Sequence, residues 1–152
     1  MSHIIETNLQ KYFPLSRTAW LVIGDVIALL IFVLVGRRNH SLSISDIGAT
    51  LATAVPFWIG WFVVAPWLGL FRPEVCRSPR KWLPRLLLAW AIGCSLALIL
   101  RTLFLGRPIF GGISLSFAIV TFGVTTVLLV MWRLIYSWWL NRAAEPVDTG
   151  AA

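Results

Sequence analysis

The sequence predicts an all-α integral membrane protein, an antiparallel bundle of four transmembrane helices with both termini in the cytoplasm. The first observation behind this prediction is composition: 59% of the 152 residues are hydrophobic and only 12% are charged. Soluble domains carry about a quarter charged residues, and a soluble fold this small has too much surface to hide so many apolar side chains. The second observation is that the apolar residues fall into separate runs, each near the ~20 residues that cross a hydrocarbon core of ~30 Å.

The apolar runs define the membrane domain, which is expected to cover residues 19–136. They lie at residues 19–35, 47–70, 83–105 and 112–136. Backbone polar groups cannot remain unpaired in lipid, and the alternating segments of a β-barrel are missing, so each run predicts a helix. The first run contains Asp25 and lacks a small-residue cleavage site, which favours a retained helix over a signal peptide.

The segments outside the helices complete the organisation. The three connections are short, at residues 37–46, 71–82 and 106–111, and short connections make consecutive helices run antiparallel. A serine together with Asp46 is expected to start the second helix. Two terminal segments remain. The N-terminal cytoplasmic segment covers residues 1–18. The small, polar cytoplasmic tail, which we expect to be disordered, covers residues 137–152.

The distribution of basic residues predicts the orientation. Of the 13 Lys and Arg residues, one set flanks the termini and the second connection: Lys11, Arg17, Arg72, Arg77, Arg80, Lys81, Arg85, Arg133 and Arg142. The smaller set flanks the first and third connections: Arg37, Arg38, Arg101 and Arg107. The positive-inside rule therefore places the termini in the cytoplasm of a multi-pass cell-membrane protein. Six tryptophans near the same helix ends fit an interfacial belt: Trp20, Trp67, Trp82, Trp132, Trp138 and Trp139.

Several classes of function are disfavoured by the same residues. The net charge of +7 belongs to helix ends rather than to a basic groove, so we expect no nucleic-acid partner. Cys76 and Cys94 are far apart, and His3 and His40 are isolated, which favours neither a disulfide framework nor a metal site. No catalytic motif and no pair of neighbouring carboxylates is present. We therefore expect no enzymatic activity and no cofactor.

Asp25 is the unusual residue of the first helix, because it lies about 10 Å from the inner end at 1.5 Å per residue. An unpaired carboxylate at a helix centre costs about 2.5 to 3.5 kcal/mol. Protonation, pairing with an arginine, or contact with water in a cavity would each relieve this cost. Depth favours Arg133 as the partner, with Arg85 second, since both lie near inner helix ends. The pair would either orient the helices or serve as a proton or anion site. The alternative to pairing is that Arg133 extends to the lipid headgroups.

Two further basic clusters are candidates for contact with anions. The outer one contains Arg37, Arg38, Arg101, Arg107 and His40, which meet a single carboxylate, Asp46. It would either hold an anion such as a lipid phosphate or make ordinary headgroup contacts. The inner one is expected to contact anionic lipids at the cytoplasmic face, at about 1 kcal/mol for each basic residue. Its members are Arg72, Arg77, Arg80 and Lys81.

The helices also carry packing signals. Ala89, Gly93 and Ala97 form a ladder of small residues that favours close helix contact. Pro56 and Pro66 lie within the second predicted helix, where they would either kink it and open a cavity or simply be tolerated in the membrane. Three tryptophans of similar depth would line an aromatic pocket or pack in the membrane core: Trp58, Trp61 and Trp90.

Several short motifs occur together in the order typical of a known family. They are Gly24-Asp25 followed by residues 28–38 and His40, Pro56-Phe57 with Gly60-Trp61, Leu100-Arg101, Gly106-Arg107-Pro108 and Trp132-Arg133. Over about residues 19–136 the chain resembles the family catalogued as domain of unknown function 3054. The resemblance implies a small integral membrane protein of bacteria or archaea without an established activity. It also marks the positions to test: Asp25, Arg37, Arg38, Arg101, Arg107 and Arg133.

Three functions compete on this basis. A non-enzymatic accessory or assembly component of a larger membrane complex fits the small size and the short connections best. A small transporter or channel is the alternative, since Asp25 and the intramembrane arginines resemble groups on transport paths; with so few helices it would require a homo-oligomer. An intramembrane enzyme acting on lipid has only the outer arginines in its favour.

Overall fold

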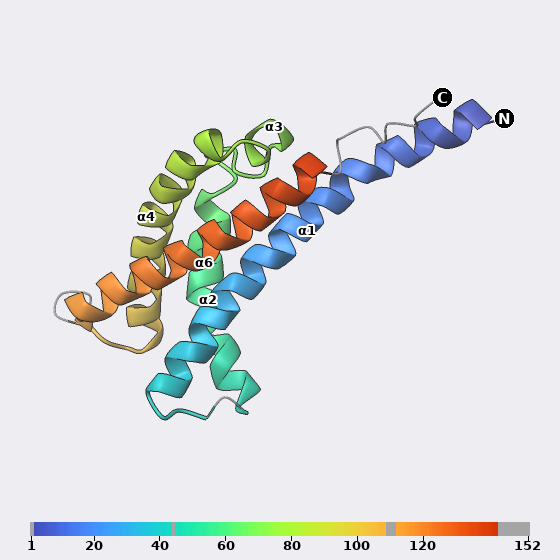
Figure 1. The fold of residues 1–152 in the computed structure, drawn as a ribbon. Coiled ribbons are helices and arrows are strands. Elements are labelled where there is room, and N and C mark those ends of the chain that lie inside the picture. Colours follow the sequence, from blue (N-terminus) through green and yellow to red (C-terminus); the bar gives the residue numbers. More distant parts are fainter. Residues whose placement is uncertain (1, 44, 109–111, 143–152) are drawn as a thin grey trace.

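The fold is entirely helical in the part of the chain that the structure, a computed structural model, describes. That part comprises the backbone of residues 2–43, 45–108 and 112–142, with side chains from Arg17 onward. The helices are α1 (Ser2–Asn39), α2 (Ile47–Val64), the short α3 (Pro73–Cys76), α4 (Pro79–Phe104) and α6 (Leu115–Arg142). Their arrangement is shown in Figure 1.

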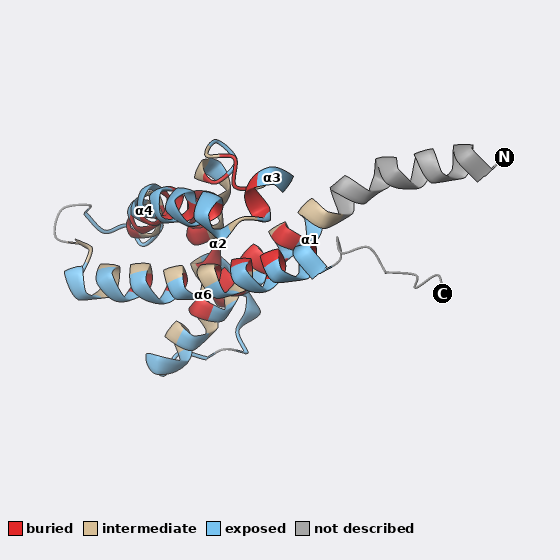
Figure 2. Ribbon diagram, turned by 45° about the horizontal axis from the view of Figure 1, so that its top comes forward, coloured by how far each residue is buried: buried red, intermediate tan, exposed pale blue. Residues whose placement is uncertain are grey.

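The prediction of four membrane-length apolar helices is confirmed. The segments that are long and apolar enough to cross a membrane are Arg17–Asn39, Ile47–Val64, Pro79–Phe104 and Leu115–Arg142. Their outward faces carry large exposed apolar side chains, while the buried residues lie where the helices meet (Figure 2). This distribution is the one expected when the surrounding solvent is lipid rather than water.

The two ends of the bundle are more helical than the sequence predicts. α1 begins at Ser2, so residues 2–18 are helical and continuous with the first apolar helix. α6 continues to Arg142, so residues 137–142 do not belong to a tail; residues 143–152 lie outside the described part. The last turns of α6 are fixed because Ser137 Oγ and Asn141 Nδ2 both donate to the main-chain oxygen of Arg77, at 3.0 and 3.2 Å.

The second helix is shorter than the predicted range of 47–70. It begins with Asp46 itself as N-cap, whose side chain accepts from the Ala49 N–H at 3.0 Å, where a serine was expected. It passes through Pro56 but ends at Val64, so Pro66 lies in the following turn and does not kink the helix. Gly69 closes this turn at φ 68°, a left-handed conformation that glycine adopts without steric cost.

Three helices end in the same hydrogen-bonded arrangement, the Schellman motif. After α2, the Leu70 N–H donates to Ala65 O and the Gly69 N–H to Pro66 O, at 3.2 and 2.9 Å. α4 ends in the same way, with Gly106 at φ 63°. At the end of α1 the left-handed position is occupied by Ser41, at φ 57°. A residue with a Cβ atom in this conformation costs free energy that glycine avoids.

We therefore expect Ser41→Gly to raise the free energy of unfolding by up to about 1 kcal/mol. Ser41→Val should lower it, because a β-branched side chain tolerates positive φ least. Reversible unfolding of the purified protein in mixed micelles measures both variants. Equal stabilities of the glycine and valine variants would show that this end of α1 does not adopt the left-handed turn.

Close approach of main chains holds α2 against α4. A Cβ atom added to Gly60 would lie 2.2 Å from the Gly93 oxygen, and one added to Gly93 would lie 2.7 Å from the Gly60 oxygen. Ala89 and Ala97, which flank Gly93 on the same face, are fully buried. α1 packs against α6 through another glycine, since the Trp132 indole occupies the position of a Cβ atom on Gly24. α1 also contacts α2, and α6 contacts α4, so the four long helices form one bundle.

Candidate functional site

The centre of the bundle contains an ion pair between α1 and α6. Arg133 Nη2 lies 2.6 Å from Asp25 Oδ2, and the exposed fractions of the two side chains are 1% and 0%. Arg133 belongs to a stripe of α6 that is buried at every fourth residue, together with Thr121, Thr125 and Leu129. On α1, Asp25 lies beside Gly24, where the Trp132 ring packs closely. The ion pair therefore lies in the α1–α6 contact and is closed from solvent.

Two groups from the region of α2 complete the polar contacts of the pair. Trp61 Nε1 donates to Asp25 Oδ2 at 3.0 Å, so one carboxylate oxygen receives two donors. Arg133 Nη1 donates to the main-chain oxygen of Leu70 at 2.6 Å. This carbonyl is free to accept because Leu70 follows the left-handed turn at Gly69 and lies outside the helical hydrogen-bond ladder. Hydrogen bonds of this charged kind are stronger than neutral ones.

Aromatic rings surround the guanidinium. The Arg133 Cζ lies 5.3 Å from the centroid of the Phe71 ring and 5.8 Å from that of Trp61, distances at which a cation is attracted to a ring face. Trp61 also contacts Trp90 edge-on, at 5.7 Å between centroids, and Trp90 Nε1 donates to Thr125 Oγ1 at 2.6 Å. Polar and aromatic contacts thus link all four long helices at the level of the ion pair.

The pair is not fully hydrogen-bonded. Within the described part of the chain, Asp25 Oδ1 and Arg133 Nε are buried without a partner. Taking a carboxylate and a guanidinium out of water costs several kcal/mol for each ion, and their mutual attraction offsets this only when the geometry is good. Removing one partner would leave the other charge buried and uncompensated. The pair therefore makes the arrangement of α1, α2 and α6 sensitive to either residue.

Arg85 does not take part in this site. Its side chain is exposed, and its Nη1 lies near Gly69, 3.4 Å from the position of an added Cβ atom. Among the described residues, Asp25 forms an ion pair with Arg133 alone. Arg85 lies in the second turn of α4, which begins at Pro79, and its guanidinium is at the surface of the bundle. It thus lies with the inner basic cluster.

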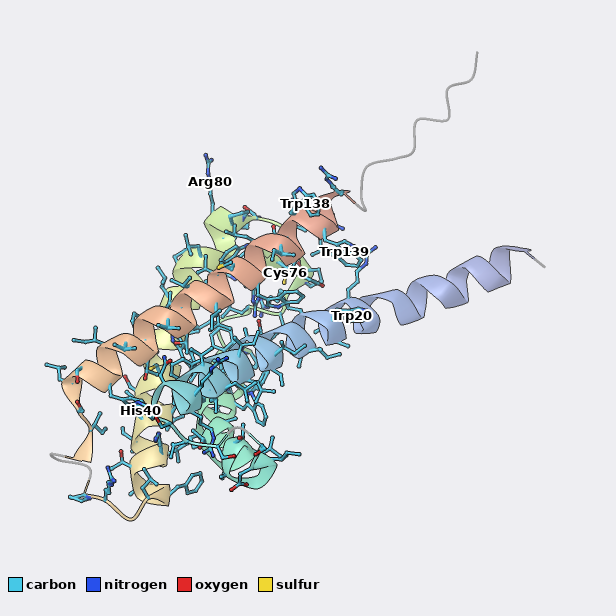
Figure 3. The ribbon with its side chains drawn as sticks, turned by 60° about the horizontal axis from the view of Figure 1, so that its bottom comes forward. Trp20, His40, Cys76, Arg80, Trp138 and Trp139 are labelled. Carbon is cyan, nitrogen blue, oxygen red and sulfur yellow. The ribbon has the colours of Figure 1, made fainter. Side chains whose placement is uncertain are left out.

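The inner basic cluster lies at the surface, around α3 and the beginning of α4. All four side chains are exposed, and Arg80 projects away from the bundle (Figure 3). The two loops between the other helices lie away from α3 (Figure 1). The cluster members Arg72, Arg77, Arg80 and Lys81 form no ion pair within the described part of the chain, so their charges are available to an external anion.

Cys76 donates a hydrogen bond to the Leu70 carbonyl, which also accepts from Arg133. Its Sγ donates to Leu70 O at 3.3 Å, and the side chain is only 4% exposed. Burial raises the pKa of the Cys76 thiol above its usual value, although the nearby Arg133 charge acts in the opposite direction. α3 therefore packs onto the ion-pair region through a buried thiol.

We expect alkylation of Cys76 in the folded Cys94→Ala variant to be slower than that of a free thiol. The thiolate is the reactive form, and a raised pKa lowers its fraction at every pH below that pKa, so the increase in rate with pH should move to higher pH. Iodoacetamide labelling followed by intact mass measures this between pH 7 and 10. Labelling of the folded protein as fast as of the denatured protein would contradict the packing of α3.

The outer basic cluster surrounds two adjoining cavities. The larger cavity, of about 400 Å³, has Arg101, Arg107 and His40 in its lining. The smaller, of about 60 Å³, lies between Arg37, His40 and Arg101. Arg37 is already engaged, since its Nη2 donates to Ser43 O at 2.6 Å. The remaining predicted member, Arg38, is exposed and lines neither cavity. His40 lies at the opposite end of the bundle from Arg80 (Figure 3).

Trp61, Leu70 and Phe71 are the residues of the ion-pair site that the sequence did not assign to it. Trp61 could have been identified as a donor, since an indole N–H in lipid requires an acceptor and its depth is close to that of Asp25. The Leu70 carbonyl could have been found from the glycine after Pro66, which predicts a helix end. Phe71 carries no such signal, because its role depends on the turn geometry.

The fold and the site define a class: a small protein with four apolar helices of membrane length around a buried Asp–Arg pair. The chain belongs to the family described as "Protein of unknown function (DUF3054)", whose profile matches residues 22–136. This match confirms the resemblance predicted from the sequence. No curated protein and no solved structure matches the chain. Within the described residues, no group of three or more His, Cys, Asp or Glu side chains lies close enough together to hold a metal ion.

Proposed function

We propose that the protein is a multi-pass cell-membrane protein that acts as a non-enzymatic accessory or assembly component of a larger membrane complex. Its four spans run antiparallel, with both termini in the cytoplasm and the inner basic cluster at the cytoplasmic face. The charge distribution supports this orientation. So do the exposed tryptophans Trp20, Trp138 and Trp139, which lie toward the end of the bundle where Arg80 projects (Figure 3) and suit a membrane interface.

The observation that carries the accessory role is the closure of the ion pair. A carboxylate that relays protons or ions must meet water or substrate during its cycle. Asp25 and Arg133 are 0% and 1% exposed, and Trp61 and the Leu70 carbonyl occupy their polar atoms. Such a pair is suited to fixing the relative positions of three helices. A rigid scaffold of this kind presents its outer faces to other subunits.

α6 offers the largest outer face for such a subunit. A smaller share of this span is buried than of any of the other three, although at 28 residues it is the longest of them. Its exposed side chains are Leu115, Ile119, Val120, Val124, Val127, Met131, Leu134, Ile135, Trp138 and Trp139. Lipid or the helices of a partner would cover this face.

A small oligomeric transporter or channel is the second candidate. The observation that favours it is the cavity beside Arg101, at the end of α4. A path through the membrane would still have to open around Asp25 and Arg133. Because four helices enclose little space, several copies would have to assemble around such a path.

The experiment that tests the accessory role is native extraction of the protein from its own membrane at its normal abundance, followed by measurement of mass and composition. Co-purification with other subunits at fixed stoichiometry is the expected result. Recovery as a homo-oligomer alone would contradict the accessory role and favour transport. A reporter fused to the C-terminus tests the orientation, and its appearance outside the cytoplasm would overturn the proposed topology.

A further inference from the structure

We propose that the cavity between the ends of α1, α4 and α6 binds the phosphate group of an anionic phospholipid, with Arg101 and Arg107 as the cationic ligands. The site lies at the opposite end of the bundle from the inner basic cluster. It is separate from the Asp25–Arg133 pair and independent of the proposed accessory role, since either could hold without the other.

The charges around the cavity are unbalanced. Arg101, Arg107 and His40 all line it, and within the described part of the chain none of them forms an ion pair. Asp46, the acidic residue nearest to His40 in the sequence, is engaged as the N-cap of α2 and lines neither cavity. Two guanidinium groups on one cavity repel each other unless an anion lies between them, so the site is electrostatically incomplete without a ligand.

Arg101 is held in position for such a ligand. Its Cζ lies 5.1 Å from the centroid of the Phe117 ring of α6, a distance at which a cation is attracted to a ring face. Its Nε is buried and has no partner among the described residues. A buried N–H without an acceptor is costly, and an anion oxygen in the cavity would provide one. Arginine suits phosphate because its planar fork donates two parallel hydrogen bonds.

The rest of the lining indicates a lipid rather than a free ion. The cavity measures about 400 Å³, within the usual range for sites of small molecules and far larger than a phosphate ion. Besides the basic residues, the lining includes the apolar Leu98, Leu105 and Phe117 and the hydroxyl-bearing Ser114 and Thr102. An amphiphile with a phosphate head and acyl chains matches this combination of basic and apolar side chains. A choline headgroup would bring an extra cation toward the arginines, which favours an anionic lipid.

Native mass spectrometry of the full chain in neutral detergent tests this inference. The protein is titrated with phosphatidylglycerol and, separately, with phosphatidylcholine, and the bound lipid is counted. We expect phosphatidylglycerol to bind about tenfold more tightly than phosphatidylcholine, a difference of roughly 1.4 kcal/mol. Arg101→Gln and Arg107→Gln should each remove this preference for the one lipid that the cavity binds. Arg38→Gln is the matched control, because it removes an equal charge from an exposed residue outside both cavities.

The outcomes separate the sources of the phosphate. Loss of the preference in Arg101→Gln and Arg107→Gln, but not in Arg38→Gln, supports the lipid site. If millimolar inorganic phosphate displaces the lipid from the native chain, the two arginines bind a free phosphate ion rather than a lipid. An equal loss in Arg38→Gln, or no preference in the native chain, would overturn the proposal. If Arg101→Gln does not fold, the variant Arg107→Gln decides the result, because Arg107 is exposed. Lipid bound at the inner basic cluster is the same in every variant.

Discussion

Replacement of Asp25 by asparagine is expected to lower the free energy of unfolding by about 3–5 kcal/mol, the usual cost of breaking a buried ion pair by removing one partner. The asparagine can still accept the Trp61 N–H, but it cannot neutralise Arg133. The guanidinium would then remain buried without an opposite charge, with neutral oxygens as its acceptors. Unfolding of the purified protein by a denaturing detergent in bicelles measures this loss, and a low abundance in the membrane should accompany it.

The matched control is Asp46→Asn, since the same change at the other aspartate of the described bundle keeps the cap. Asparagine is about as good an N-cap as aspartate, so this variant should unfold within about 0.5 kcal/mol of the native chain. A small effect of Asp25→Asn, comparable to that of Asp46→Asn, would show that the carboxylate is not paired in the folded protein. It would also favour a proton-carrying role, in which the neutral form is tolerated.

Gly60→Ala is expected to have the largest effect outside the ion pair, a loss of about 1–3 kcal/mol or more from overpacking. The added Cβ atom would lie 2.2 Å from the Gly93 carbonyl oxygen, a main-chain atom that cannot rotate away. α2 and α4 would have to separate, which weakens the contacts of Trp61 and Trp90 on the same faces. The variant is measured by the same unfolding assay.

Gly123→Ala provides the control for this change. No atom lies within 4 Å of a Cβ atom added to Gly123, and alanine is better than glycine in a helix by about 0.8–1.0 kcal/mol. The Gly123 variant should therefore match the native chain or exceed its stability. If Gly60→Ala and Gly123→Ala behave alike, α2 and α4 do not approach as closely as the structure shows.

The helices could be predicted well from the sequence because lipid imposes a simple rule on the backbone. Apolar runs of membrane length have to be helical, and all four spans were found in this way. Their ends were predicted less well. The hydropathy pattern does not predict the turn after Val64, which depends on Gly69 at positive φ. It also does not predict the hydrogen bonds to Arg77 that hold the last turns of α6, up to Arg142.

Depth along the helices predicted the ion pair, with Arg133 as the first candidate partner of Asp25 and Arg85 as the second. The positions of Asp25 and Arg133 along helices of opposite expected direction were enough to bring them together, because few other groups at that level can compensate a charge. The same argument did not identify the correct place of Arg85, since depth fixes the level of a residue but not the face of its helix. Rotation of a helix about its axis depends on packing, here on the contact between Gly60 and Gly93.

The outer cavity depends on tertiary structure to a greater extent. The sequence grouped five basic residues at one end of the bundle, yet only their arrangement separates Arg101 and Arg107, which face a cavity, from Arg38, which does not. A loop residue such as Arg107 is positioned by the turn at Gly106. No periodicity in the sequence determines this direction.

The most direct test of the structural role of the ion pair is a double-mutant cycle between Asp25 and Arg133. Unfolding free energies are measured for Asp25→Asn, Arg133→Gln and the double variant. We expect the unfolding free energies lost in the two single variants to add up to more than the loss in the double variant. The difference, which is the coupling energy, should be about 2 kcal/mol or more. A coupling energy near zero would show that the two charges act independently and would contradict the structural role proposed for the pair.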